Sequence, residues 1–98
     1  MDQEYFYRLS SEQRFQICTA YNISLIASSQ STQLSVLLNS EYSRRAQRQL
    51  IEEYIARARL NFNIVHMILT NVNIRHPSML EWIDKVELML NRIPETID

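Results

Sequence analysis

The side chains best suited to chemistry in this sequence are two histidines, one cysteine and one pair of adjacent carboxylates. His66 and His76 have no second cysteine and no Asp/Glu pattern beside them that would give metal-ligand spacing. Cys18 lies on an apolar helical stripe, which is more typical of a small buried hydrophobe than of a nucleophile. Glu52 and Glu53 are adjacent, so they point to different sides of a helix and do not form a carboxylate pair. We therefore expect no catalytic residue, no metal and no cofactor, and we do not expect an enzyme.

A short basic segment, Ser43–Gln49, could contact phosphates through Arg44, Arg45 and Arg48. It follows a short helix and a possible turn, as in helix-turn-helix DNA readers. With Asn39 as the turn residue, however, core positions of the recognition helix fall on Arg45 and Arg48. The net charge of −1 also gives no global attraction to nucleic acid or to anionic lipid. A solvated helix face with paired charges is favoured, and a nucleic-acid-binding transcriptional regulator is the alternative function.

Aromatic side chains are the strongest candidates for contacts with a partner. Tyr5, Phe6 and Tyr7 are consecutive, and Trp82 is the only tryptophan. Aromatic residues dominate binding hot spots, but they also dominate protein cores. Three consecutive aromatics cannot all face one core, so at least one of them is expected to be exposed or to cover a neighbour or a partner.

The composition excludes several classes of protein. The sequence has no glycine, whereas tight β-hairpins and phosphate-binding loops usually need glycine at positive φ. A chain of 98 residues with 46% hydrophobic residues fits one folded domain, which we take as residues 1–98. A single cysteine permits no intrachain disulfide, which suits a reducing compartment, and residues 1–4 do not begin a signal peptide. We expect a cytoplasmic protein with no membrane span.

The first main helix is expected over residues 11–28. Ser10 and Gln13 have the spacing of a capping box at its start. Residues 1–9 before it are either an N-terminal arm or a short helix. The apolar residues of this helix recur at spacings of three and four, which predicts the buried stripe Phe15, Cys18, Tyr21 and Leu25.

The Ser-rich stretch that follows predicts a break. Residues 28–32 are all polar, and a second short helix is expected over residues 32–39. Asn39 and Ser40 compete well for backbone groups, so they could end this helix or lie within a longer one.

The strongest pattern is a heptad seam within residues 41–72, which predicts a long helix. Three i,i+4 ion pairs, Glu41/Arg45, Arg48/Glu52 and Glu53/Arg57, support this interpretation. The alternation of polar and apolar residues in 61–64 and 71–74 leaves strands as the alternative. The seam consists of Ile51, Ile55, Ala58, Phe62, Val65, Leu69 and Val72.

A last helix is expected over residues 79–92, after a loop at 73–77. Pro77 disfavours helical geometry at His76, and Ser78 to Glu81 has the spacing of a capping box. Pro94 ends the helix, and residues 94–98 are expected to be frayed. The apolar seam of this helix is Met79, Ile83, Val86, Leu90 and Ile93.

These elements predict an all-α fold, a small bundle of three to four helices around a long central helix in an antiparallel pair. The short loop makes the long and last helices antiparallel, so their seams can face each other. Tyr54, Ile64 and Ile68 lie off the long seam, so the apolar surface is wider than one partner helix needs, which favours a homodimer. We expect a non-catalytic protein–protein interaction module, a small cytosolic adaptor, regulator or assembly factor. The expected partner-binding residues are Tyr5, Phe6, Tyr7, Tyr54, Ile64, Ile68 and Trp82.

Overall fold

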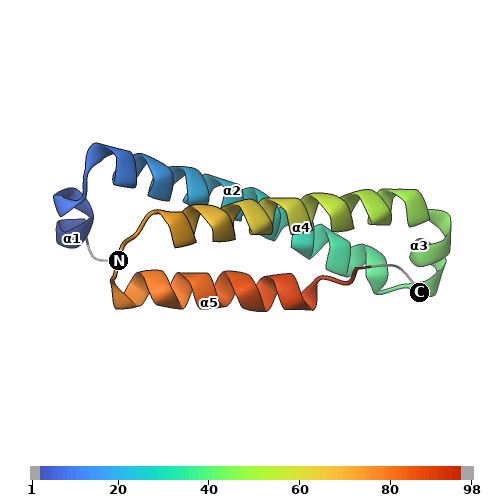
Figure 1. Ribbon diagram of the computed structural model, residues 1–98. Coiled ribbons are helices and arrows are strands. Elements are labelled where there is room, and N and C mark those ends of the chain that lie inside the picture. Colours follow the sequence, from blue (N-terminus) through green and yellow to red (C-terminus); the bar gives the residue numbers. More distant parts are fainter. Residues whose placement is uncertain (1–2, 96–98) are drawn as a thin grey trace.

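The computed structural model describes residues 3–95, which form five helices and no strand in an elongated bundle of 51 × 19 × 19 Å (Figure 1). Both α2 and α5 pack on α4, and α2 crosses behind α4 in Figure 1. The all-helical prediction is confirmed, and the strand alternative at 61–64 and 71–74 is wrong. No helix within the described residues is long and apolar enough to cross a membrane. The helices are α1 (Gln3–Arg8), α2 (Ser11–Leu38), α3 (Glu41–Ala46), α4 (Arg48–Asn71) and α5 (Pro77–Arg92).

Helix α2 begins as predicted but continues past the predicted break. In the capping box, the Gln13 backbone N–H donates to Ser10 Oγ, and the Ser10 backbone N–H donates to Gln13 Oε1, both at 3.1 Å. The helix then runs through residues 28–32, where Thr32 Oγ1 donates to the Ser28 carbonyl at 3.0 Å. This hydroxyl therefore bonds within the helix and does not stabilise another conformation. Burial of residues on both sides of the Ser-rich stretch holds it helical.

The buried side of α2 differs from the predicted one. The predicted stripe of Phe15, Cys18, Tyr21 and Leu25 is exposed, so that prediction is wrong. Tertiary packing selects a face with smaller side chains, because small side chains let two helix backbones approach closely. The residues of α2 that are buried are Ile17, Ala20, Ala27 and Leu34.

The predicted helix over 41–72 is divided at Gln47. With φ −121° and ψ 29°, Gln47 leaves helical geometry, and it separates α3 from α4. Ser40 caps α3, because its Oγ accepts from the Ser43 backbone N–H at 3.2 Å. The helix therefore ends before Asn39 and Ser40, and these two residues do not lie within a longer helix. Of the three predicted ion pairs, Arg45–Glu41 forms at 2.8 Å and Arg48–Glu52 forms at 3.3 Å.

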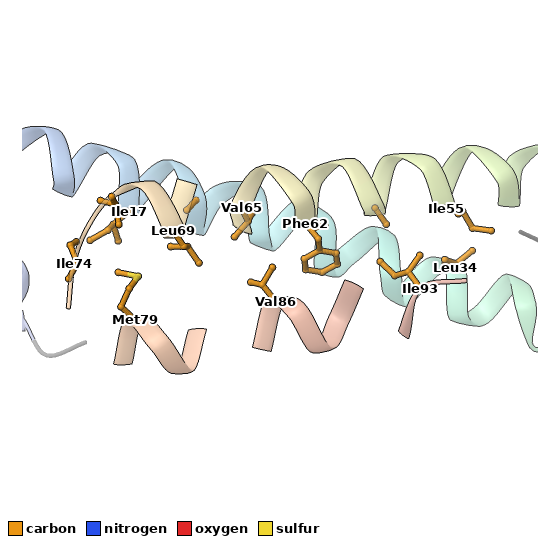
Figure 2. Close-up of a cluster of buried hydrophobic side chains, with 14 of the residues drawn as sticks. Ile17, Leu34, Ile55, Phe62, Val65, Leu69, Ile74, Met79, Val86 and Ile93 are labelled. Carbon is orange, nitrogen blue, oxygen red and sulfur yellow. The ribbon is translucent and has the colours of Figure 1, made fainter. Parts of the chain in front are cut away.

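The core lies along the seam of α4, as predicted. All seven predicted seam residues are buried, together with Met79 and Val86 of α5 and Ile93 at the C-cap of α5. Figure 2 shows Val65 and Phe62 of α4 facing Val86 across the antiparallel α4–α5 pair. Arg59 Nη1 donates to the Ile93 carbonyl at 3.1 Å at one end of this pair.

The loop before α5 sets the start of that helix. His76 is extended, with φ −131° and ψ 141°, which confirms the predicted effect of Pro77. His76, and not Ser78, is the N-cap, because its Nδ1 accepts from the Ser78 backbone N–H at 3.2 Å. The predicted capping box at Ser78 is therefore wrong by two positions. Asn73 adopts a positive φ of 58° in a chain without glycine, which asparagine tolerates better than most residues.

Candidate interaction surfaces

An apolar groove lies between α1, α2 and α5 and is lined by three aromatic side chains. We call it the aromatic groove. Both α2 and α5 pack on α4, but they make little direct contact with each other, which leaves a hollow of about 630 Å³ between them. Aromatic rings with a few polar groups among them are typical of a surface that binds other molecules. The lining residues are Gln3, Phe6, Ile17, Tyr21, Ser24, Ser78, Met79 and Trp82.

Helix α1 is held at the end of this groove by aromatic contacts. The Tyr5 ring packs on the His76 ring with centroids 4.3 Å apart, and Phe6 meets Tyr7 edge-on at 5.7 Å. Tyr5 and Phe6 are half-buried against the core, whereas Tyr7 is exposed. The segment at residues 1–9 therefore includes a short helix, and its three aromatics divide between core and solvent as the sequence implied.

Ser24 places a polar atom without a partner in the wall of the groove. Its Oγ is buried and has no hydrogen-bond partner among the described residues. A buried hydroxyl without a partner costs about 1–3 kcal/mol.

The structure brings only two of the seven predicted partner-binding residues together in this groove. Phe6 and Trp82 both line it, from α1 and from α5. Tyr54 lies elsewhere, in a second hollow of about 300 Å³. Ile64 and Ile68 are half-buried on α4, and Ile68 packs against the core. The apolar residues beside the seam of α4, Tyr54, Ile64 and Ile68, are therefore largely covered by other parts of the same chain.

The second hollow lies between the end of α2 and the start of α4. Its lining is almost entirely apolar, and Leu50 and Tyr54 contribute from α4. The residues from α2 are Thr32, Gln33, Val36 and Leu37.

One side of α2 is exposed and uncharged; it points away from α4 along most of the helix, and at the end of the helix its residues Thr32 and Val36 also line the second hollow. Between Arg14 and Glu41 the sequence contains no charged residue. The seven residues at alternating spacings of three and four on this side are all exposed, and Phe15 is 73% exposed. An uncharged helix face that leaves several large apolar side chains exposed is unusual for a protein surface. We call this surface the outward face of α2, and it consists of Phe15, Cys18, Asn22, Leu25, Ser29, Thr32 and Val36.

The basic residues considered for nucleic acid are engaged within the chain. Arg45 and Arg48 pair with glutamates on their own helices. Arg44 Nη1 donates to the Leu38 carbonyl at 2.9 Å and so covers an unpaired carbonyl at the end of α2. Arg45 and Arg48 therefore form surface ion pairs, and Arg44 binds the end of α2.

The remaining reactive groups lie apart from one another. His66 Nε2 contacts Glu87 Oε1 at 2.9 Å between α4 and α5, and His76 caps α5. Cys18 is exposed on α2, so the interpretation of a buried hydrophobe is wrong. Within residues 3–95, no group of three or more His, Cys, Asp or Glu side chains could hold a metal ion.

The sequence contained a signal for the outward face of α2 that hydrophobic periodicity did not reveal. Periodicity located an apolar stripe on α2 but assigned it to the core. The run without charge from residue 15 to residue 40 shows that two sides of this helix, and not one, lack the charges of a solvated surface. The aromatic groove could not be found in this way, because it depends on how α2 crosses α4.

Comparison of the chain with protein-family models, with curated proteins and with solved structures finds no match.

Proposed function

We propose that this protein is a non-catalytic protein–protein interaction module that binds a partner in the aromatic groove. The observation that carries the proposal is the convergence of Phe6, Tyr21 and Trp82 on one hollow of about 630 Å³. Aromatic side chains in a concave site are the usual anchors of binding energy.

The partner that fits this groove is an apolar segment of another protein. Apolar residues supply most of the lining, and Gln3 and Ser78 supply uncharged hydrogen-bonding groups at the wall. A short amphipathic helix or an extended peptide with one or two large apolar residues would bury its anchors there. We propose that the module acts as a homodimer in the cytoplasm, as a small adaptor, regulator or assembly factor. Its single cysteine suits a reducing compartment.

The test is recovery of partners by tagged protein from its native lysate, with nuclease treatment, followed by quantitative mass spectrometry. Tyr21→Glu places a charge at an exposed position of the groove, and Trp82→Ala removes the largest anchor. We expect each variant to lose a defined partner by at least about tenfold, since a hot-spot residue contributes about 2 kcal/mol or more.

The control variant is Leu88→Glu, which changes a residue of α5 that is 50% exposed and does not line the groove. It should recover the partner as wild type does, and circular dichroism should show the same helix content for all variants. Equal recovery by wild type and groove variants would contradict the proposal. Partners lost on nuclease treatment and on replacing Arg44, Arg45 and Arg48 with alanine would instead support the nucleic-acid alternative.

A further inference from the structure

The outward face of α2 has a chemistry that limits what can cover it. Phe15 and Leu25 are 73% and 53% exposed, and Val36 is 69% exposed at the other end of the helix. Among them lie only uncharged residues. A charge on a covering surface would lose its water without gaining an opposite charge. The occupant must therefore present a long, uncharged and partly apolar surface.

The same face on a second copy of the chain meets these requirements. It is uncharged from residue 15 to residue 40, and its exposed residues repeat at alternating spacings of three and four. This repeat is the spacing at which two helices pack side by side. A surface that matches itself forms a symmetric dimer, which is the commonest kind of oligomer.

The helix dipoles favour an antiparallel pair. Two parallel helices place their like dipole ends together, whereas an antiparallel pair places the positive end of one helix beside the negative end of the other. The charges at the ends of this face do not select an orientation, because Glu12 and Arg14 lie together at one end, and at the other end Glu41 pairs with Arg45 at 2.8 Å.

The antiparallel register matches the side chains along the face. With the two-fold axis beside Leu25, Phe15 of one copy lies opposite Val36 of the other. Asn22 then lies opposite Ser29, so their polar groups can hydrogen bond to each other. The large apolar side chains meet at the centre and at both ends, and the polar ones meet between them.

We infer that two copies of the chain form an antiparallel homodimer through the outward face of α2. The inference rests on the homodimer in the proposed function and assigns it a surface, which is separate from the aromatic groove. A helix of 28 residues is about 42 Å long. One helix face of this length gives an interface at the small end of specific dimers, so dissociation is expected in the micromolar range.

The first test is sedimentation velocity over concentrations from about 1 µM to about 1 mM, for wild type, Leu25→Glu and Leu88→Glu. Wild type and Leu88→Glu should convert from monomer to dimer as concentration rises. Leu25→Glu places two like charges together at the axis, so its dissociation constant should rise at least about tenfold. Its helix content should not change, because Leu25 is 53% exposed in the monomer. An equimolar mixture of Leu25→Glu and Leu25→Lys should dimerise again.

The second test is orientation, by mild oxidation and non-reducing electrophoresis. In the antiparallel pair the two Cys18 residues are about 20 Å apart along the axis, so wild type should not cross-link. Leu25→Cys in a Cys18→Ser background places the thiols at the axis and should cross-link rapidly.

Each outcome separates the inference from the rest of the proposed function. A wild type that stays monomeric at every concentration overturns the homodimer and this interface, but leaves binding in the aromatic groove intact. A dimer that Leu25→Glu does not weaken overturns this interface alone, and points to another surface. Rapid cross-linking through Cys18 overturns the antiparallel arrangement.

Discussion

Helices α2 and α4 are the two longest helices and pack against each other, but their solvent sides are opposite in character. The solvent side of α4 includes Glu52, Glu53 and Arg57, whereas the solvent side of α2 has no charge after Arg14. The buried side of α4 has large side chains at every position except Ala58, whereas two of the four buried residues of α2 are alanines, Ala20 and Ala27.

This difference explains why sequence patterns identified one buried face and not the other. On α4 the polar residues leave a single apolar stripe, so the stripe and the core coincide. On α2 both sides lack charge, and the larger apolar side chains lie on the exposed side. Residue size and spacing therefore favoured Phe15 and Leu25, although the buried residues of α2 are Ile17, Ala20, Ala27 and Leu34.

The largest expected effect comes from removing the same side chain on the two helices. Phe62 on α4 is 2% exposed, and Phe15 on α2 is 73% exposed. We expect Phe62→Ala to lower the free energy of unfolding by about 3–5 kcal/mol because it leaves a cavity, and Phe15→Ala to change it by less than about 0.5 kcal/mol. Urea denaturation at micromolar protein, followed by circular dichroism, measures both values.

If Phe62→Ala does not fold, Phe62→Leu leaves a smaller cavity and preserves the comparison. A loss from Phe15→Ala as large as that from the Phe62 variant would show that the outward face of α2 is buried within one chain.

A smaller effect is expected from enlarging an alanine on each helix. Ala27 is fully buried between α2 and α4, whereas Ala56 is exposed on α4. We expect Ala27→Leu to destabilise the fold by about 1–3 kcal/mol, because the added atoms force the helices apart. Ala56→Leu should change stability by less than about 0.5 kcal/mol. Equal midpoints of urea denaturation for the two variants would contradict the close contact at Ala27.

The smallest effect is expected at two serines of α2. Ser24 Oγ is buried without a partner among the described residues, whereas Ser28 is exposed. Both Ser→Ala changes gain the same helix propensity, so their difference isolates the cost of burying the Ser24 hydroxyl. We expect Ser24→Ala to be more stabilising than Ser28→Ala by about 1 kcal/mol in thermal unfolding. Equal stabilities would indicate that the Ser24 hydroxyl is satisfied in solution.

The fold was predictable from sequence wherever local chemistry decides the outcome. The Ser10–Gln13 capping box, the effect of Pro77 on His76 and the seam from Ile51 to Val72 depend on neighbours within a few residues or on one clear stripe. The absence of glycine correctly favoured helices. Part of the predicted frayed tail, residues 96–98, lies outside the described residues.

The errors occurred where distant contacts decide between local options. Residues 28–32 could be a turn in isolation, and they stay helical because Ala27 and Leu34 are anchored on α4. Gln47 could continue a helix, but the chain must turn there to bring α4 back along α2. Of the residues that line the aromatic groove, only Phe6 and Trp82 were among the predicted partner-binding residues, because Tyr21 and Ser24 join the groove where α2 crosses α4.

The position of α4 between α2 and α5 also governs how the chain folds and opens. Each main contact joins helices that follow one another along the chain, apart from the short α3, and such local topologies fold in microseconds to milliseconds. Helix α5 depends on α4 for nearly all of its packing, so it can detach while the α2–α4 hairpin persists. Such partial opening would expose the seam of α4 and separate one wall of the aromatic groove from the other. Binding in the aromatic groove is therefore coupled to the detachment of α5. A ligand that bridges α2 and α5 would hold α5 in place, so it would slow amide hydrogen exchange throughout α5.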